Sequence, residues 1–143
     1  MKKLYLFLLL LTFFSSGYIF FDDDSGHFNQ IPYESIPDLS KEFIENNFKD
    51  YTVHNTLVSR HYIVIFKGGS SIHFNYKGEW INIIGNRYTI SFEKANKFIP
   101  SNIINIIKLK YKIINSIYKK SKGYQFKVDD GKIVSFDKYG NML

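Results

Sequence analysis

The alternation of apolar and polar residues along Tyr62–Glu79 recurs without a gap 62 residues later, along Tyr124–Asn141. In both stretches apolar side chains fall on every second residue, which is the period of a β-strand with one buried face. Gly68-Gly69 interrupts the first stretch and Asp130-Gly131 interrupts the second, and such residue pairs favour tight hairpin turns. Each stretch therefore predicts a β-hairpin.

A further turn follows each hairpin. Asn75 to Gly78 and Asp137 to Gly140 begin with an amide or a carboxylate and end with glycine, as type I turns prefer. Trp80–Ile84 then continues the first copy as another strand, whereas the second copy reaches at most a stub before Leu143. Shorter strands are expected ahead of the two hairpins, near Tyr51–Leu57 and Ile114–Tyr118.

Upstream of each hairpin the apolar period changes to that of a helix. Pro37 and Pro100 each follow an isoleucine, and proline suits the first helical turn because its missing N–H would have no partner there. The apolar face predicted after these prolines comprises Leu39, Phe43, Ile44 and Phe48 in the first copy and Ile103, Ile106, Ile107 and Tyr111 in the second. Each copy is thus a helix followed by an antiparallel meander. Two copies can merge their sheets, so we expect an α+β fold with one sheet and both helices on one face.

The N-terminus has the pattern of an export signal. Lys2 and Lys3 precede the apolar run Leu4–Phe14, and the small residues Ser15–Gly17 follow it, so cleavage is expected after Gly17. An uncleaved membrane anchor is the alternative, because Tyr18–Phe21 prolongs the apolar run. The expected organisation is a signal peptide at 1–17, a flexible leader at 18–31, and repeats at 32–92 and 93–143. The mature protein would be periplasmic or secreted.

Charge is divided unevenly along the chain. The whole chain has a formal net charge of +6. Residues 18–92 contain 6 basic and 9 acidic side chains, whereas residues 93–143 contain 11 basic and 4 acidic ones. A basic half suits an anionic partner, although lysines that solvate an isoleucine-rich segment are the simpler explanation.

No catalytic or cofactor motif is visible. Cysteine is absent, and the histidines show none of the short spacings typical of zinc sites. His61 and His73 are expected near opposite ends of their hairpin and not at an evident distance for sharing a ligand, and neither a metal nor a cofactor is predicted. Ser70-Ser71 lies in a hairpin turn and not in a nucleophile elbow. An enzyme is not expected, and the export signal argues against nucleic acid.

The predicted strands place Ile63 and Ile65 on the sheet face away from the helices, because their equivalents Gln125 and Lys127 are polar. An antiparallel sheet normally shows polar residues on its solvated face, so two isoleucines there indicate a contact surface. The alternative is that the leader or a second copy of the chain covers this face. The candidate binding residues are His61, Ile63, Ile65, Lys67, His73, Gln125 and Lys127.

The ordered set of motifs resembles the PepSY-like, β-lactamase-inhibitor-like domain family of bacterial exported proteins. Its first half is carried by Ile36-Pro37, Tyr62-x-Val64, Gly69, Ile72-x-Phe74 and Gly78-Glu79-Trp80. The second half has Ile99-Pro100, Gly123-Tyr124-x-Phe126, Asp130-Gly131, Val134-x-Phe136 and Gly140, but Met142 stands where the first copy has tryptophan.

The resemblance implies an exported, non-catalytic domain whose relatives by fold include inhibitors that grip an enzyme across the sheet face. We therefore expect a binding module for a protein partner in the envelope, with self-association as a further prospect and an inhibitory role as its specific form. The alternative is a structural envelope component whose basic second half binds anionic polymer or lipid headgroups. Membrane contact is expected only through the signal segment, if that segment is kept.

Overall fold

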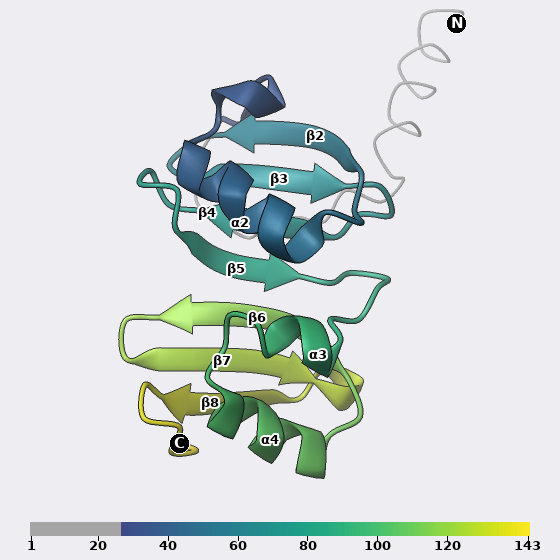
Figure 1. Cartoon of the computed structure of the whole chain (residues 1–143), viewed down its shortest axis with the longest axis vertical. Helices are drawn as coiled ribbons and strands as arrows, with labels where there is room; N and C mark the ends of the chain where they lie inside the picture. Colours follow the sequence, from purple (N-terminus) through teal and green to yellow (C-terminus); the bar gives the residue numbers. More distant parts are fainter. Residues whose placement is uncertain (1–26) are drawn as a thin grey trace, which may run out of the picture.

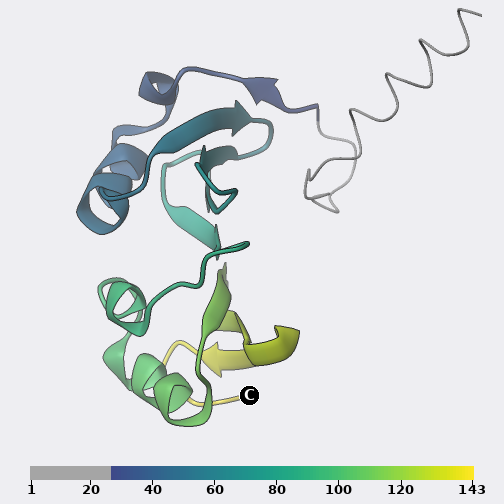
Figure 2. The same ribbon diagram turned by 90° about the vertical axis from the view of Figure 1, so that its right-hand side faces the viewer.

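The computed structural model describes residues 27–143, which form one open antiparallel sheet with the helices on one face (Figures 1 and 2). Its eight strands lie in the order in which they occur along the chain. The α+β prediction is confirmed. The expected signal peptide and its cleavage site lie outside the described residues, as does most of the expected leader. None of the helices within residues 27–143 is long and apolar enough to cross a membrane.

Each repeat is a helix followed by consecutive strands. The first repeat contains α2 (Asp38–Phe48), β2 (Val53–Val58), β3 (Tyr62–Phe66), β4 (Ser71–Phe74) and β5 (Trp80–Ile84). The second contains α4 (Ser101–Lys110), β6 (Ile114–Lys120), β7 (Gly123–Val128) and β8 (Ile133–Asp137). The remaining elements are β1 (Asn29–Gln30), which pairs with β2, the short helix α3 (Phe92–Ala95) between the repeats, and the 3-10 helices η1 (Tyr33–Ser35) and η2 (Asp129–Gly131). The boundary expected between residues 92 and 93 falls at the start of α3.

The two repeats join through the pairing of β5 with β6. Asn82, Ile83 and Ile84 lie opposite Tyr118, Ile117 and Ser116, and this seam makes one continuous sheet from two meanders. The second repeat ends in a short stub, as expected: Phe136 bridges to Met142, and the backbone N–H of Asp137 donates to the carbonyl oxygen of Asn141.

The main core lies between the sheet and the helices. Phe66, Phe74, Phe126 and Phe136 are its largest fully buried side chains, and they point to the helix side of their strands. The helix faces differ slightly from expectation. Leu39 is 49% exposed because it lies in the first turn of α2, beside the Gly78 turn and not over the sheet.

The turns after the hairpins are held by their first residues. The Asn75 side-chain oxygen accepts the backbone N–H groups of Lys77 and Glu79. Asp137 does the same for Tyr139 and Asn141 in the second repeat. These matched turns confirm the predicted repeat at the level of hydrogen bonds.

Each of these turns is also tied to the start of the preceding helix. The hydroxyl of Ser40 in α2 donates to the carbonyl oxygen of Gly78 at 3.0 Å. In the second repeat the side-chain amide of Asn102 in α4 donates to the carbonyl oxygen of Tyr139, also at 3.0 Å. The N-terminal end of each helix is therefore hydrogen-bonded to the turn that follows the hairpin of the same repeat.

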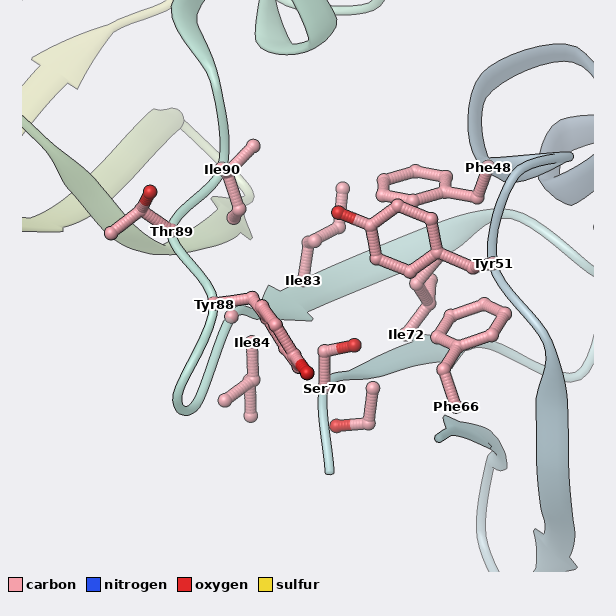
Figure 3. Close-up of a pocket in the computed structure, with 12 residues that line it drawn as sticks. Phe48, Tyr51, Phe66, Ser70, Ile72, Ile83, Ile84, Tyr88, Thr89 and Ile90 are labelled. Carbon is pink, nitrogen blue, oxygen red and sulfur yellow. The ribbon is translucent and has the colours of Figure 1, made fainter. Parts of the chain in front are cut away.

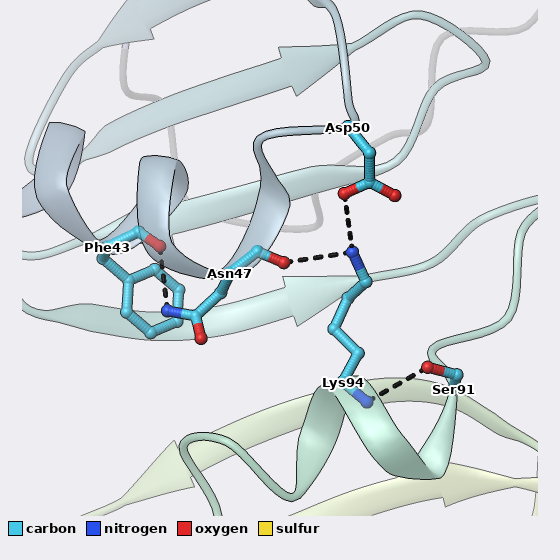
Figure 4. A network of polar contacts seen from close by, with 5 residues as sticks. All are labelled: Phe43, Asn47, Asp50, Ser91 and Lys94. Carbon is cyan, nitrogen blue, oxygen red and sulfur yellow. Dashed lines mark hydrogen bonds and ion pairs between the residues drawn. The ribbon is translucent and has the colours of Figure 1, made fainter.

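Lys94 connects the repeats on the helix side (Figure 4). Its ammonium group donates to the backbone oxygen of Asn47 at the end of α2 and to the Asp50 carboxylate, at 3.0 and 2.9 Å. The same group lies 4.9 Å from the ring centroid of Phe48 and 4.5 Å from that of Tyr51. A cation is favourable at a helix C-terminus and over an aromatic face. Lys94 in α3 therefore pins the second repeat to the helix of the first.

Candidate functional site on the sheet face away from the helices

Strand register defines two rows of side chains on the face that no helix of the described chain covers (Figure 2). The first row runs Leu57, Ile63, His73, Asn82, Tyr118, Gln125 and Ser135. The second row runs Asn55, Ile65, Ser71, Ile84, Ser116, Lys127 and Ile133. Six of the seven candidate residues, all but Lys67, belong to this side of the sheet. Lys67 follows the end of β3, where its backbone N–H donates to the carbonyl oxygen of Thr52.

The first half of this face is closed to solvent at its centre. Ile63, Ser71 and His73 are 0%, 2% and 3% exposed, so the expectation that Ile63 and His73 face solvent is wrong. The strand parity was correct, because Ile63 lies outside the main core cluster and its register partners are Leu57 and His73. Parity decides the face of a side chain, but it does not decide whether that face is covered.

In the second half of the face, the burial of the side chains agrees better with the sequence-based expectation that they face solvent. Gln125 is half-buried and its side-chain amide donates to the hydroxyl of Ser135, while Lys127 is exposed. Ile65 and Ile84 are half-buried, and Ile133 is exposed at the edge of the sheet. The accessible apolar side chains of the second row are therefore those of Ile65, Ile84 and Ile133, and the buried Ser71 and Ser116 lie between them.

His61 and His73 meet at the closed end of the face. The Nε2 atom of His61 lies 3.2 Å from the Nδ1 atom of His73. Their rings lie within 20° of parallel, with centroids 5.1 Å apart, and the edge of Phe28 packs near His61. The expectation that these histidines lie near opposite ends of the hairpin is wrong. His73 pairs with Ile63 across the hairpin. His61 lies two residues before Ile63, on the same face of the sheet, and is therefore the diagonal neighbour of His73.

Burial favours the neutral form of the His73 imidazole. Desolvation, and secondarily the nearby His61, lowers the pKa of His73 to about 3. Its Nε2 atom lies 3.5 Å from the hydroxyl oxygen of Ser71, the residue two positions before it on β4. The pair thus presents a fixed, uncharged ring beside a more accessible one.

Sequence analysis did not predict a small cavity at the joint between the repeats (Figure 3). It is lined mainly by aromatic and aliphatic side chains, and the buried hydroxyl of Ser70 has no hydrogen-bond partner among residues 27–143. The cavity holds about 10 Å³. That is room for one water molecule at most, so we do not regard it as a ligand site. Its lining includes Phe48, Tyr51, Phe66, Ile72, Ile83, Tyr88 and Ile90.

Among residues 27–143 no three histidine, cysteine, aspartate or glutamate side chains come together as a metal-binding group. The hydroxyl of Ser71 lies 3.5 Å from an imidazole nitrogen of His73 but is itself buried on a strand. A serine nucleophile must reach a substrate carbonyl, and this one is 2% exposed. Ser71 is therefore not placed to act as a nucleophile.

Solved structures share this fold. The chain aligns with a periplasmic protein of Bacteroides thetaiotaomicron for which calcium regulation has been suggested, with a TM-score of 0.72 and 22% identity over 81% of this chain and 94% of that one. A periplasmic protein of unknown function from Bacteroides vulgatus gives a TM-score of 0.70 and 24% identity over 83% and 97%. A periplasmic protein of the DUF2874 family from the same organism gives 0.72 and 22% over 86% and 96%. At these identities the likeness establishes the fold alone.

Comparison with curated protein sequences finds no match. The model of the β-lactamase-inhibitor-like, PepSY-like family matches residues 60–143, from the start of the first hairpin to the end of the second repeat. That range holds most of the sheet and the whole repeated hairpin pattern from which the resemblance was inferred. The chain belongs to the PepSY-like, β-lactamase-inhibitor-like family.

Proposed function

We propose that this protein is an exported, non-catalytic binding module that docks on a protein partner in the cell envelope. Its family supports a role in binding, and the solved relatives with the same fold are described as periplasmic. The observation that carries the proposal is the sheet face that the helices of the described chain leave uncovered (Figure 2). Inhibition of an envelope enzyme is the specific form that this role would take.

The docking surface is the accessible part of the second row. Ile65, Ile84 and Ile133 supply apolar anchors, and the side chains of Ser71 and Ser116 between them in the register are buried. Lys127 adds a charged group near the sheet edge. A flat apolar strip with a polar rim is the usual composition of an interface whose energy comes from a few buried anchors.

Two matched variants test this surface. Ile65→Lys places a charge on the strip, whereas Leu109→Lys places the same charge at an 87% exposed site on α4, on the helix side. Each variant and the wild type would be used to capture partners from an envelope extract of the native host. We expect Ile65→Lys alone to abolish capture of a partner that the wild type retains. Equal capture by both variants would contradict docking through this face.

The basic second half supports a second candidate, a component that rests on anionic polymer or lipid headgroups. Its exposed lysines include Lys108, Lys110, Lys119, Lys120, Lys122, Lys132 and Lys138. Charge-driven binding weakens steeply with ionic strength, whereas an apolar strip does not. Repeating the capture at low and high salt therefore separates the two. Partner binding that is lost at high salt and is unaffected by Ile65→Lys would favour the anionic surface.

A further inference from the structure

We propose that one end of the sheet binds an acidic polysaccharide of the cell envelope. The surface comprises three neighbouring segments, residues 75–79, 119–123 and 137–141, which together form the turn row. The proposal rests on the second candidate function, binding to an anionic surface. It specifies where that surface lies on the fold and which class of polymer it takes.

Strand pairing brings the three segments side by side at one end of the sheet, on the left in Figure 1. The pairing of β5 with β6 joins the first segment to the second, and the ammonium group of Lys119 lies 5.3 Å from the ring centroid of Trp80. The backbone N–H of Lys138 donates to the carbonyl oxygen of Lys122 at 3.0 Å and joins the second segment to the third. Neighbouring strands lie about 4.8 Å apart, so hairpin ends in such a row recur about every 10 Å.

Positive charge is concentrated on this end of the sheet. At the opposite end of the second repeat, in residues 111–113 and 129–133, Lys112 and Lys132 are balanced by Asp129 and Asp130. The turn row instead has five lysines, all exposed, against two acidic residues, which leaves a net charge of +3. The lysines are Lys77, Lys119, Lys120, Lys122 and Lys138, and the acidic residues are Glu79 and Asp137.

Both carboxylates of the turn row are engaged within their own turns. The side-chain amide of Asn75 donates to Glu79, and that of Asn141 donates to Asp137, each at 2.8 Å. Asp137 also accepts the backbone N–H groups of Tyr139 and Asn141. These donors partly offset the two negative charges, so the exposed lysines dominate the charge that an approaching polymer meets.

Two exposed tyrosines add flat ring faces to the lysines. Tyr76 and Tyr139 are 73% and 72% exposed, and the ammonium groups of Lys77 and Lys138 lie 5.9 and 4.9 Å from their ring centroids. A tyrosine ring packs its apolar face against the C–H groups of a sugar while its hydroxyl makes hydrogen bonds.

The composition of the turn row favours a hydrated polymer over a bilayer. Its three segments contain no aliphatic side chain. Surfaces that insert into lipid carry residues such as tryptophan, phenylalanine and leucine beside their lysines. Exposed lysines and tyrosines in a row therefore suit an extended chain of acidic sugars.

Isothermal titration of the purified protein with polygalacturonate, a carboxylated polysaccharide, tests the turn row, with neutral dextran as the control polymer. The wild type should bind polygalacturonate and not dextran. Lys122→Glu combined with Lys138→Glu should weaken binding by about tenfold or more, because two attractive charges become repulsive. The matched pair Lys112→Glu and Lys132→Glu makes the same change in net charge at the opposite end of the sheet, and should leave the affinity within about twofold of the wild type.

Tyr139→Ala keeps every charge and tests the contact with sugar rings. It should weaken binding of polygalacturonate by about threefold. Binding of poly-L-glutamate, which carries carboxylates without sugar rings, should be unchanged by this variant. Equal losses for the two polymers, or no loss for either, would contradict recognition of a polysaccharide.

Absence of binding to polygalacturonate, or equal affinities of the two double variants, would overturn the proposal. Tighter binding to phosphatidylglycerol vesicles than to polygalacturonate would also overturn it, but would leave the second candidate function standing in its lipid form. Ile65→Lys should bind polygalacturonate as the wild type does, so a failure of the docking strip is measured separately from a failure of the turn row.

Discussion

Phe74 and Phe136 fill equivalent places in the two halves of the core, 62 residues apart in the chain and 0% and 1% exposed. Each lies on the helix side of the second strand of its hairpin. Truncation to alanine removes a buried ring and leaves a cavity, so Phe74→Ala and Phe136→Ala should each lower the free energy of unfolding by about 3–5 kcal/mol. Urea unfolding monitored by circular dichroism measures both. A melting curve untouched by Phe136→Ala would contradict the equivalence of the repeats.

Ile63 and Ile65 lie on the same face of β3, but Ile63 is fully buried and Ile65 is half-buried. Substitutions at the two positions should therefore differ in their effect on stability. Ile63→Gln should destabilise the fold by about 2–5 kcal/mol, because it removes a fully buried aliphatic side chain. Ile65→Lys should change stability by less than about 1 kcal/mol, because a half-buried side chain on this face can turn its charge to water. Thermal melts of the two single variants provide the test, and equal losses would show that both residues belong to one buried cluster.

Alanine substitutions at the two turn glycines should differ in their effect on stability. Gly78 and Gly140 both have positive φ, of 89° and 91°. A Cβ at Gly78 would lie 2.7 Å from the ring carbon Cβ of Pro37, whereas one at Gly140 would meet the side-chain amide of Asn102, which can swing away.

Gly78→Ala should therefore cost more than about 1 kcal/mol, the lower bound for alanine in a conformation that it resists. Gly140→Ala should cost less, because Asn102 can move aside, so that the φ penalty and the exposed hydrogen bond from Asn102 to Tyr139 are the losses that remain. The two free energies of unfolding, measured under one set of conditions, decide the matter. A larger loss in Gly140→Ala would mean that the Asn102 bond to Tyr139 matters more than the Pro37 contact.

The ion pair between Lys94 and Asp50 predicts a small pH dependence of stability. The hydrogen bond from Lys94 holds the pKa of Asp50 below its usual value of 3.8. Because the folded-state pKa is lower, the stabilising effect is present above the unfolded value and is lost as the pH falls through the folded one. The Asp50 carboxylate is 65% exposed, so the pair contributes less than about 1 kcal/mol.

Asp50→Asn should accordingly be slightly less stable than the wild type at pH 7, and the two proteins should converge well below pH 3.8. Unfolding by urea at both pH values, at low ionic strength, measures the difference. A difference in the free energy of unfolding that persists in acid would assign the effect to the shape of the residue and not to its charge.

The repeat architecture was predictable because each of its parts has a local cause. Pro37 and Pro100 mark helix starts, Gly68-Gly69 and Asp130-Gly131 mark hairpins, and Asn75 and Asp137 initiate matching turns. These signals act within a few residues of one another, so they survive in the sequence. The alternation of Tyr62, Val64 and Phe66 with their neighbours also assigned the correct faces.

The site was less predictable because it depends on relations between strands. The meeting of His61 with His73 follows from the register of the hairpin, which pairs Ile63 with His73 and so places His61 diagonally across. The burial of Ile63 depends on what covers its face of the sheet, and the alternation of apolar and polar residues does not reveal this. The Lys94 contacts with Phe48 and Tyr51 join residues more than 40 positions apart and have no local signature.

The sequential order of the strands has a consequence for how the molecule is assembled. Every strand from β2 onward pairs with the strand made just before it, so each new segment finds its partner already in place. Apart from the β1–β2 and β5–β6 pairs, which are joined by segments containing helices, this pairing is short-range, and short-range pairing avoids the entropic cost of closing long loops and favours rapid folding. A chain that emerges from its N-terminal end can therefore build this sheet progressively, one strand at a time, and need not wait for its last residues.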